Sequence, residues 1–171
     1  DSKKTVITGG SAFNVKAESL RLGNFSREEV KKLYGQHTSE TGQKFNKNVF
    51  PRVWELTKGQ PWLVNALAYE ACFRMKEGKK RTREITLDII EQAKENLILR
   101  RDTHLDQLAD KLKEDRVRRV LEPILSGAKE AEKIPADDLD YAIDLGLVTR
   151  DKHIRIANQI YREVIPRQLT Y

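Results

Sequence analysis

Gly59, Gln60 and Pro61 constrain the fold of this chain more than any other residues, because they end one helix and begin the next. Glycine readily adopts the left-handed conformation that ends helices, and proline fits the first helical position, where its missing N–H is not needed. Residues 49–58 before this step and residues 62–75 after it carry apolar side chains at helical spacing. We therefore expect two helices joined by a tight turn.

Similar signals divide residues 25–101 into four helices. Ser26 is an expected N-cap with Glu29 at the third helical position, which is the pattern of a capping box. Phe25 and Val30 have the spacing of the accompanying hydrophobic staple, and this first helix is expected to end near Gly42.

The other three helices follow the same logic. The second stops at Gly59, although Pro51 falls near its start, and the third runs from Pro61 to Gly78. The third helix is apolar on more than one face, so it is expected at the centre of a small bundle. The fourth begins after Ile85 and Thr86 and carries its apolar residues at helical spacing.

Residues 102–171 predict a second domain. A helical stretch with apolar residues from Leu105 to Leu125 ends at Gly127, and a second helix over residues 137–145 breaks at Gly146. Residues 147–157 alternate like a β-hairpin, and an amphipathic helix follows. The order helix, helix, hairpin and helix is that of a winged-helix domain.

The predicted fold class is therefore mostly α. We divide the chain into residues 1–24, residues 25–101 as a helical bundle, and residues 102–171 as a winged-helix domain. Residues 4–8 and 15–22 are β-prone, but two short strands do not form a stable sheet alone. We interpret them as strands of a larger sheet domain whose other strands are missing.

Composition and charge exclude several classes of protein. The chain has 171 residues and no apolar run of about 20 residues that would span a membrane, so we expect a cytoplasmic protein. The single Cys72 excludes a disulfide framework and is expected to be a buried, inert thiol. The three histidines show no metal spacing, and neither a phosphate-binding P-loop nor an acidic Mg²⁺-binding strand end is present in the sequence.

The net charge of +6 comes wholly from the first part of the chain. Residues 1–101 hold 20 basic and 12 acidic residues, whereas residues 102–171 hold 12 and 14. Part of the excess lies between Lys76 and Arg83. The sequence allows two interpretations of these basic residues, a solvated loop or a contact with a phosphate backbone or an acidic partner. The helix that would read DNA carries four aspartates and no lysine or arginine, which disfavours direct DNA reading.

Several blocks of the sequence resemble the C-terminal portion of prokaryotic AAA-like ATPases, which are P-loop proteins of the signal-transducing type related to archaeal ATPases. These blocks are residues 11–20, 36–38 with 40–43, 156–167, and the segment VWELTKGQPWLVNAL at 53–67. One departure is Gln159, where the family commonly has proline.

The resemblance implies that residues 1–24 are the terminal strands of a truncated P-loop core, that residues 25–101 are a helical lid-type bundle and that residues 102–171 are a winged helix. It implies ATP or ADP bound only in a longer parent chain. It nominates Gly59, Gln60, Pro61 and Trp62 as one wall of the adenine site. The alternative explanation is that Gly59 simply ends one helix and Pro61 begins the next. The chain alone is expected to bind no cofactor and to catalyse no reaction.

The resemblance further implies two partners, which are the missing core of the parent chain and a protein that contacts the winged helix. The implied function is a regulatory region that couples nucleotide state to partner binding in signal transduction. A free-standing winged-helix module that binds nucleic acid through its basic first unit is the alternative, and a protein-binding adaptor is a third possibility.

Overall fold

A computed structural model describes residues 23–100, 103–127 and 133–169 of the chain. The chain divides into two compact units, Asp1–Asp102 and Thr103–Tyr171, each of which is described by itself. The strands predicted at residues 4–8 and 15–22 lie outside the described residues. Within the described part, no helix is both long and apolar enough to cross a membrane.

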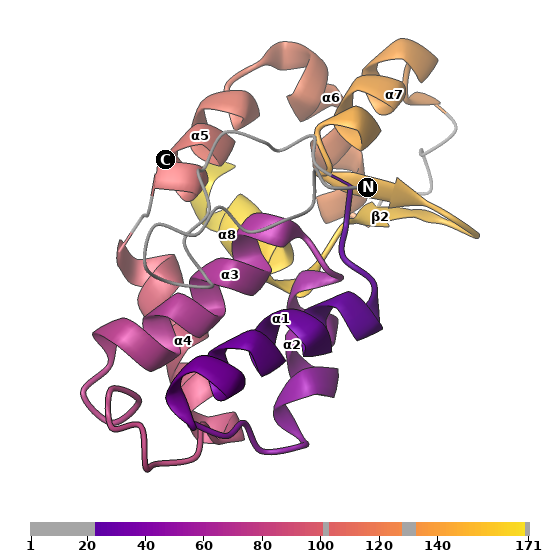
Figure 1. Cartoon of the computed structure of the whole chain (residues 1–171). Coiled ribbons are helices and arrows are strands. Elements are labelled where there is room, and N and C mark those ends of the chain that lie inside the picture. The colour runs from indigo at the N-terminus through magenta and orange to yellow at the C-terminus, as the bar shows by residue number, and fades with distance from the viewer. Residues whose placement is uncertain (1–22, 101–102, 128–132, 170–171) are drawn as a thin grey trace. The chain divides into compact units, whose positions relative to one another are not determined.

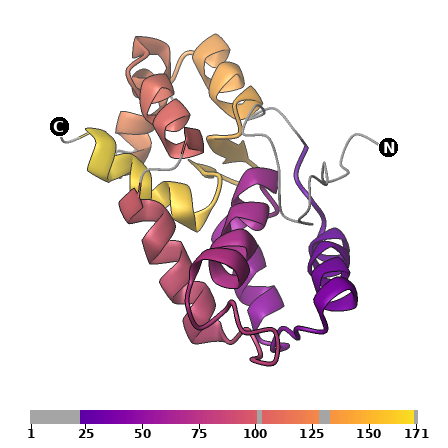
Figure 2. The ribbon, with the colours of Figure 1, turned by 60° about the vertical axis from the view of Figure 1, so that its left-hand side comes forward.

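The first unit is a bundle in which α3 has the central place (Figure 1). Helix α3 packs against α2, α4 and the π-helical segment η2, and most of its residues are buried. Figure 2 shows α3 between α4 and α1. The elements of this unit are α1 (Arg27–Thr41), α2 (Val49–Thr57), α3 (Pro61–Tyr69), η2 (Glu70–Arg74) and α4 (Leu87–Arg100).

The predicted ends of α1 are confirmed. The Ser26 hydroxyl accepts a hydrogen bond from the Glu29 amide at 3.1 Å, which satisfies one of the free N–H groups of the first turn. Phe25 and Val30 are both buried, as a hydrophobic staple requires. Gly42 ends the helix with φ of 77°, and its N–H donates to the Thr38 carbonyl.

The third helix ends earlier than predicted. Helix α3 stops at Tyr69, η2 continues to Arg74, and Met75 is extended, so the helical segment does not reach Gly78. The reason is tertiary. Glu70 is buried and accepts hydrogen bonds from Asn96 and Arg100 of α4, while Gly78 packs so tightly on the chain that a Cβ there would lie 1.5 Å from the Ala71 carbonyl oxygen.

The second unit contains α5 (Thr103–Leu112), α6 (Asp115–Leu125), α7 (Ala136–Asp144), β1 (Val148–Arg150), β2 (Ile154–Ile156) and α8 (Gln159–Leu169). The prediction of a single helical stretch up to Gly127 was wrong, because the chain breaks into α5 and α6. Leu112 and Val117 are five residues apart, which shifts the apolar face out of helical phase, and the residues between them are polar. Glu114 is the extended N-cap of α6.

The predicted hairpin is present. Strands β1 and β2 pair antiparallel, with Val148 opposite Ile156 and Arg150 opposite Ile154. Val148 and Ile156 are buried on the same face of the hairpin, where β1 contacts α7 and β2 contacts α6 and α8. The described part of this unit is thus mostly helical with a small two-stranded sheet, and three helices rather than two precede the hairpin.

Gln159 is the first residue of α8, so it occupies the position where proline is well tolerated. The side-chain oxygen of Asn158 accepts a hydrogen bond from the Tyr161 amide at 2.9 Å and caps the helix without proline.

Candidate functional site

Gly59 lies in a crowded turn between α2 and α3. It follows Lys58, and both residues have left-handed backbones, with φ of 48° for Lys58 and 79° for Gly59. A Cβ on Gly59 would lie 2.1 Å from the Phe25 carbonyl oxygen and 2.8 Å from the Trp54 ring. The Gly59 carbonyl also accepts a hydrogen bond from the Phe25 amide at 2.7 Å. Glycine is therefore required here because the backbone before α1 packs against the turn.

Gln60 caps α3 with its side chain. Its Oε1 accepts a hydrogen bond from the Leu63 amide at 2.7 Å, and its backbone carbonyl accepts one from Val64 at 3.0 Å. The Leu63 bond occupies one of the otherwise free N–H groups of the first turn, and Pro61 has no N–H, so the start of α3 is a poorer phosphate site than a free helix terminus. The other end of the Gln60 amide is different, because Nε2 is buried and has no hydrogen-bond partner among the described residues.

A second incomplete polar group lies one turn further along α3. Asn65 is buried, and its Nδ2 donates to the Pro61 carbonyl at 2.7 Å. Its Oδ1 has no hydrogen-bond partner in the described part of the chain. A buried polar atom without a partner costs about 1–3 kcal/mol. Pro61 is also buried. The unsatisfied donor, Gln60 Nε2, comes before it in the sequence, and the unsatisfied acceptor, Asn65 Oδ1, comes after it.

Trp62, the fourth predicted site residue, is half-buried at the start of α3. The structure thus brings Gly59, Gln60, Pro61 and Trp62 together at one turn because they are consecutive. It assigns Gly59 a packing role and Gln60 a capping role. Their contact with an adenine base stays a prediction.

Cys72 and His37 are both buried in the first unit, and burial shifts the pKa of each. Cys72 is buried as predicted, and burial raises the pKa of its thiol to about 12. Burial also lowers the pKa of His37. No group of histidine, cysteine or acidic side chains within the described ranges could hold a metal ion.

A hydrogen-bond network centred on Gln43 was missed by sequence reasoning. Gln43 is fully buried, and its Nε2 donates to the carbonyl oxygens of Gly78, Lys80 and Arg83 at 2.8, 3.1 and 3.0 Å. Its Oε1 lies 2.8 Å from His37 Nε2, which must therefore carry the proton and donate. We call this arrangement the Gln43 clip, and it holds the basic loop that contains Lys80.

Arg81 reinforces this clip and fixes the loop further. Its guanidinium donates to the Gln43 Oε1 at 3.1 Å and to the Cys72 carbonyl at 2.6 Å, and it lies 4.6 Å from the centre of the Phe73 ring. Arg81 is therefore a structural member of the basic cluster. Lys76, Lys79, Lys80 and Arg83 remain exposed.

Two arginines of α6 contact the acidic helix α7 in the second unit. That helix carries four aspartates, of which Asp138 accepts a hydrogen bond from Arg119 of α6 at 2.8 Å. This contact lowers the pKa of the Asp138 carboxyl. The Arg116 guanidinium of α6 lies 3.4 Å from the centre of the Tyr141 ring on α7. Arginines from the neighbouring helix thus compensate part of the acidic charge, a pairing that the spacing within α7 could not reveal.

Comparisons with known proteins give little guidance. No family model matches the chain, and no curated protein matches it. Among solved structures, a RuvB protein of Thermotoga maritima, determined as a point variant, matches with a TM-score of 0.41 and 16% sequence identity. The match covers 84% of this chain and 50% of that chain. Similarity at this level does not assign the chain to a family.

Proposed function

We propose that this chain is the lid and winged-helix region of an AAA-like regulatory ATPase. In this proposal a P-loop core binds the phosphates, and the turn at Gly59, Gln60 and Pro61 closes over the base. The chain alone carries out no catalysis. The sequence resemblance is the source of the proposal, and the order of helices, hairpin and helix in the second unit is compatible with a winged helix.

The observation that carries the proposal is the pair of buried, unsatisfied polar atoms at the start of α3. Gln60 Nε2 is a donor and Asn65 Oδ1 is an acceptor, and both incur the cost of a missing hydrogen bond. An adenine base offers a ring nitrogen that accepts and an exocyclic amine that donates. A small movement of this turn on docking with the core would let a base or core backbone satisfy these atoms.

The second unit supplies the regulatory part of the proposal. Nucleotide-dependent movement of the lid would expose or hide a surface for a protein partner. Such a partner is favoured over duplex DNA because Asp137, Asp140 and Asp144 are exposed on α7. Phosphates approaching this helix would meet repulsion from these carboxylates.

Association with a separately produced P-loop core from the same natural protein tests the proposal. We expect the chain to bind that core more tightly with ATP than without nucleotide. The variant Gln60→Glu keeps an oxygen to cap Leu63, and it replaces the unsatisfied donor with a carboxylate oxygen and its negative charge. We expect it to weaken ATP-dependent association by roughly tenfold, which corresponds to about 1.4 kcal/mol.

Gln36→Glu makes the same chemical change at an exposed position of α1 and serves as the matched control. Association that is identical with and without ATP would contradict the proposal. Salt-sensitive binding of the chain to duplex DNA, with no response to ATP, would instead support the nucleic-acid module.

A further inference from the structure

A groove between α1 and α2 in the first unit combines an apolar floor with a cationic rim. Its volume is about 390 Å³. The floor consists of Val30, Phe50, Pro51 and Trp54, and both aromatic side chains are partly exposed. Covering apolar surface of this kind with a partner is favourable, because it removes that surface from water.

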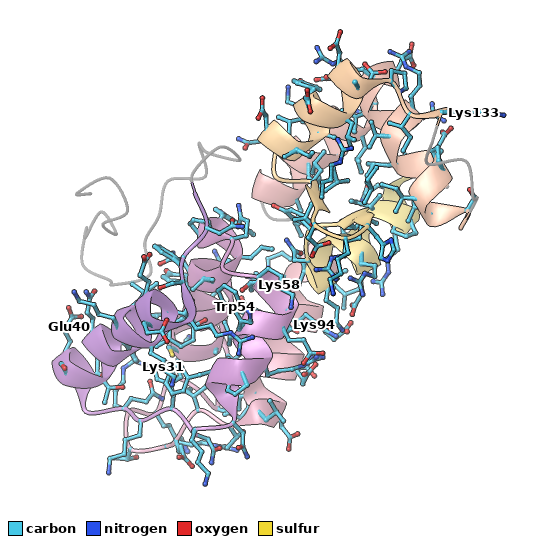
Figure 3. The ribbon with its side chains drawn as sticks, turned by 90° about the vertical axis from the view of Figure 1, so that its right-hand side faces the viewer. Lys31, Glu40, Trp54, Lys58, Lys94 and Lys133 are labelled. Atoms are coloured by element: carbon cyan, nitrogen blue, oxygen red, sulfur yellow. The ribbon has the colours of Figure 1, made fainter. Side chains whose placement is uncertain are left out.

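Three cations line the rim of this groove. Arg27 and Lys31 are one turn apart on α1, and Lys47 precedes α2 on the other side. Arg27 lies over the Trp54 ring, with 5.3 Å between its guanidinium carbon and the ring centre. Figure 3 labels Lys31 and Trp54, which approach the groove from different helices.

Two of the three rim charges, those of Lys31 and Lys47, have no acidic partner among the described residues. Lys31 and Lys47 are exposed, and neither forms an ion pair with another described residue. Glu28 is the one acidic side chain of the groove and lies three residues before Lys31, yet no ion pair joins them. The groove therefore presents an excess of positive charge on both sides of an apolar floor.

We propose that this groove binds an acidic amphipathic segment of a partner protein. The apolar side chains of that segment would cover Phe50 and Trp54. Carboxylates on its two flanks would face Arg27 and Lys31 on one side and Lys47 on the other, as in the docking of amphipathic helices into grooves. Trp54 of the groove also packs against the turn at Gly59, but the proposal does not depend on nucleotide binding.

The geometry favours an acidic peptide over single-stranded nucleic acid. Stacking of bases needs open aromatic faces, and Arg27 already covers one face of Trp54. Cations on opposite rims match a segment with an apolar centre and two charged flanks, whereas a phosphate backbone follows one continuous basic track.

Fluorescence of Trp54 in the full chain tests this proposal, with Trp62→Phe leaving Trp54 as its single tryptophan. The probe is a synthetic peptide about four helical turns long, with leucine and phenylalanine on one face and glutamate on both flanks. We expect the peptide to change Trp54 emission and to bind less tightly as salt rises. The double variant Lys31→Glu with Lys47→Glu should weaken binding by roughly tenfold or more.

The double variant Lys32→Glu with Lys76→Glu makes the same charge change at exposed positions outside the groove, and it should alter binding by less than about twofold. Equal binding of a peptide with glutamine in place of glutamate would overturn the proposal. So would equal weakening in both double variants, or unchanged Trp54 emission up to about 1 mM peptide. A single-stranded oligonucleotide that binds the groove more tightly than the peptide would assign it to nucleic acid instead.

Discussion

Removing the Gln43 side chain should loosen the basic loop of the first unit. In the variant Gln43→Ala, the carbonyls of Gly78, Lys80 and Arg83 lose the amide donor that gathers them, and His37 loses its acceptor. Arg81 also contacts the Gly78 carbonyl and the Arg83 amide donates to the Lys80 carbonyl, but Gln43 is the group that bonds to all three carbonyls. We therefore expect both a loss of stability and a local opening.

The magnitude follows from how many of these groups water can reach after the substitution. Lys80 and Arg83 are exposed, so water can replace the lost bonds to their carbonyls, and the Gly78 carbonyl keeps a contact with Arg81 at 3.3 Å. His37 is only 1% exposed, and its Nε2 loses the Gln43 acceptor. About two net buried hydrogen bonds at roughly 1–1.5 kcal/mol each predict a loss of about 2–3 kcal/mol.

Urea unfolding of the two proteins measures this loss, and hydrogen exchange of residues 76–84 measures the opening. Gln36→Ala, at an exposed position of the same helix as His37, is the control and should cost less than about 0.5 kcal/mol. A Gln43→Ala variant as stable as this control, with unchanged exchange in the loop, would refute the role of the clip.

Three further predictions concern the first unit. Burial lowers the pKa of His37, so the unfolded chain binds more protons than the folded chain. The contribution of His37 to stability is therefore complete above about pH 6.5 and is lost as pH falls through its folded pKa. Urea unfolding of His37→Gln as a function of pH should lack this loss of stability. A double-mutant cycle on the Arg52 and Glu91 ion pair, which joins α2 to α4, should give a coupling free energy of about 0.5–1 kcal/mol that decreases with salt. A coupling free energy of zero would show that the pair does not stabilise the fold. Cys72 should resist alkylation in the folded chain and react after unfolding; rapid reaction under native conditions would contradict its burial and its raised pKa.

Features set by neighbouring residues were predictable from the sequence. The Ser26 cap, the Gly42 end and the start of α3 at Pro61 depend on local hydrogen bonds and backbone preferences, and the structure has all three. The hairpin follows from alternation over residues 147–157.

Features set by distant residues were not predictable in this way. The change from α3 to η2 at Glu70 involves partners on α4, which are 26 and 30 residues away. The packing of Gly59 on Phe25 is equally distant in sequence.

The candidate site shows the same division. The sequence placed Gly59, Gln60, Pro61 and Trp62 at a turn between helices, and that turn exists. It could not show that Gln60 uses one end of its amide as a cap and leaves the other end unsatisfied. That distinction depends on which atoms the surrounding chain buries.

Photo-crosslinking of the natural protein with an ATP analogue that carries an azide on its base tests the central claim most directly. Peptide mapping should place the crosslink on residues 59–62, and unlabelled ATP should suppress it. Crosslinks confined to other segments would contradict the assignment of Gly59, Gln60, Pro61 and Trp62 to the wall of an adenine site.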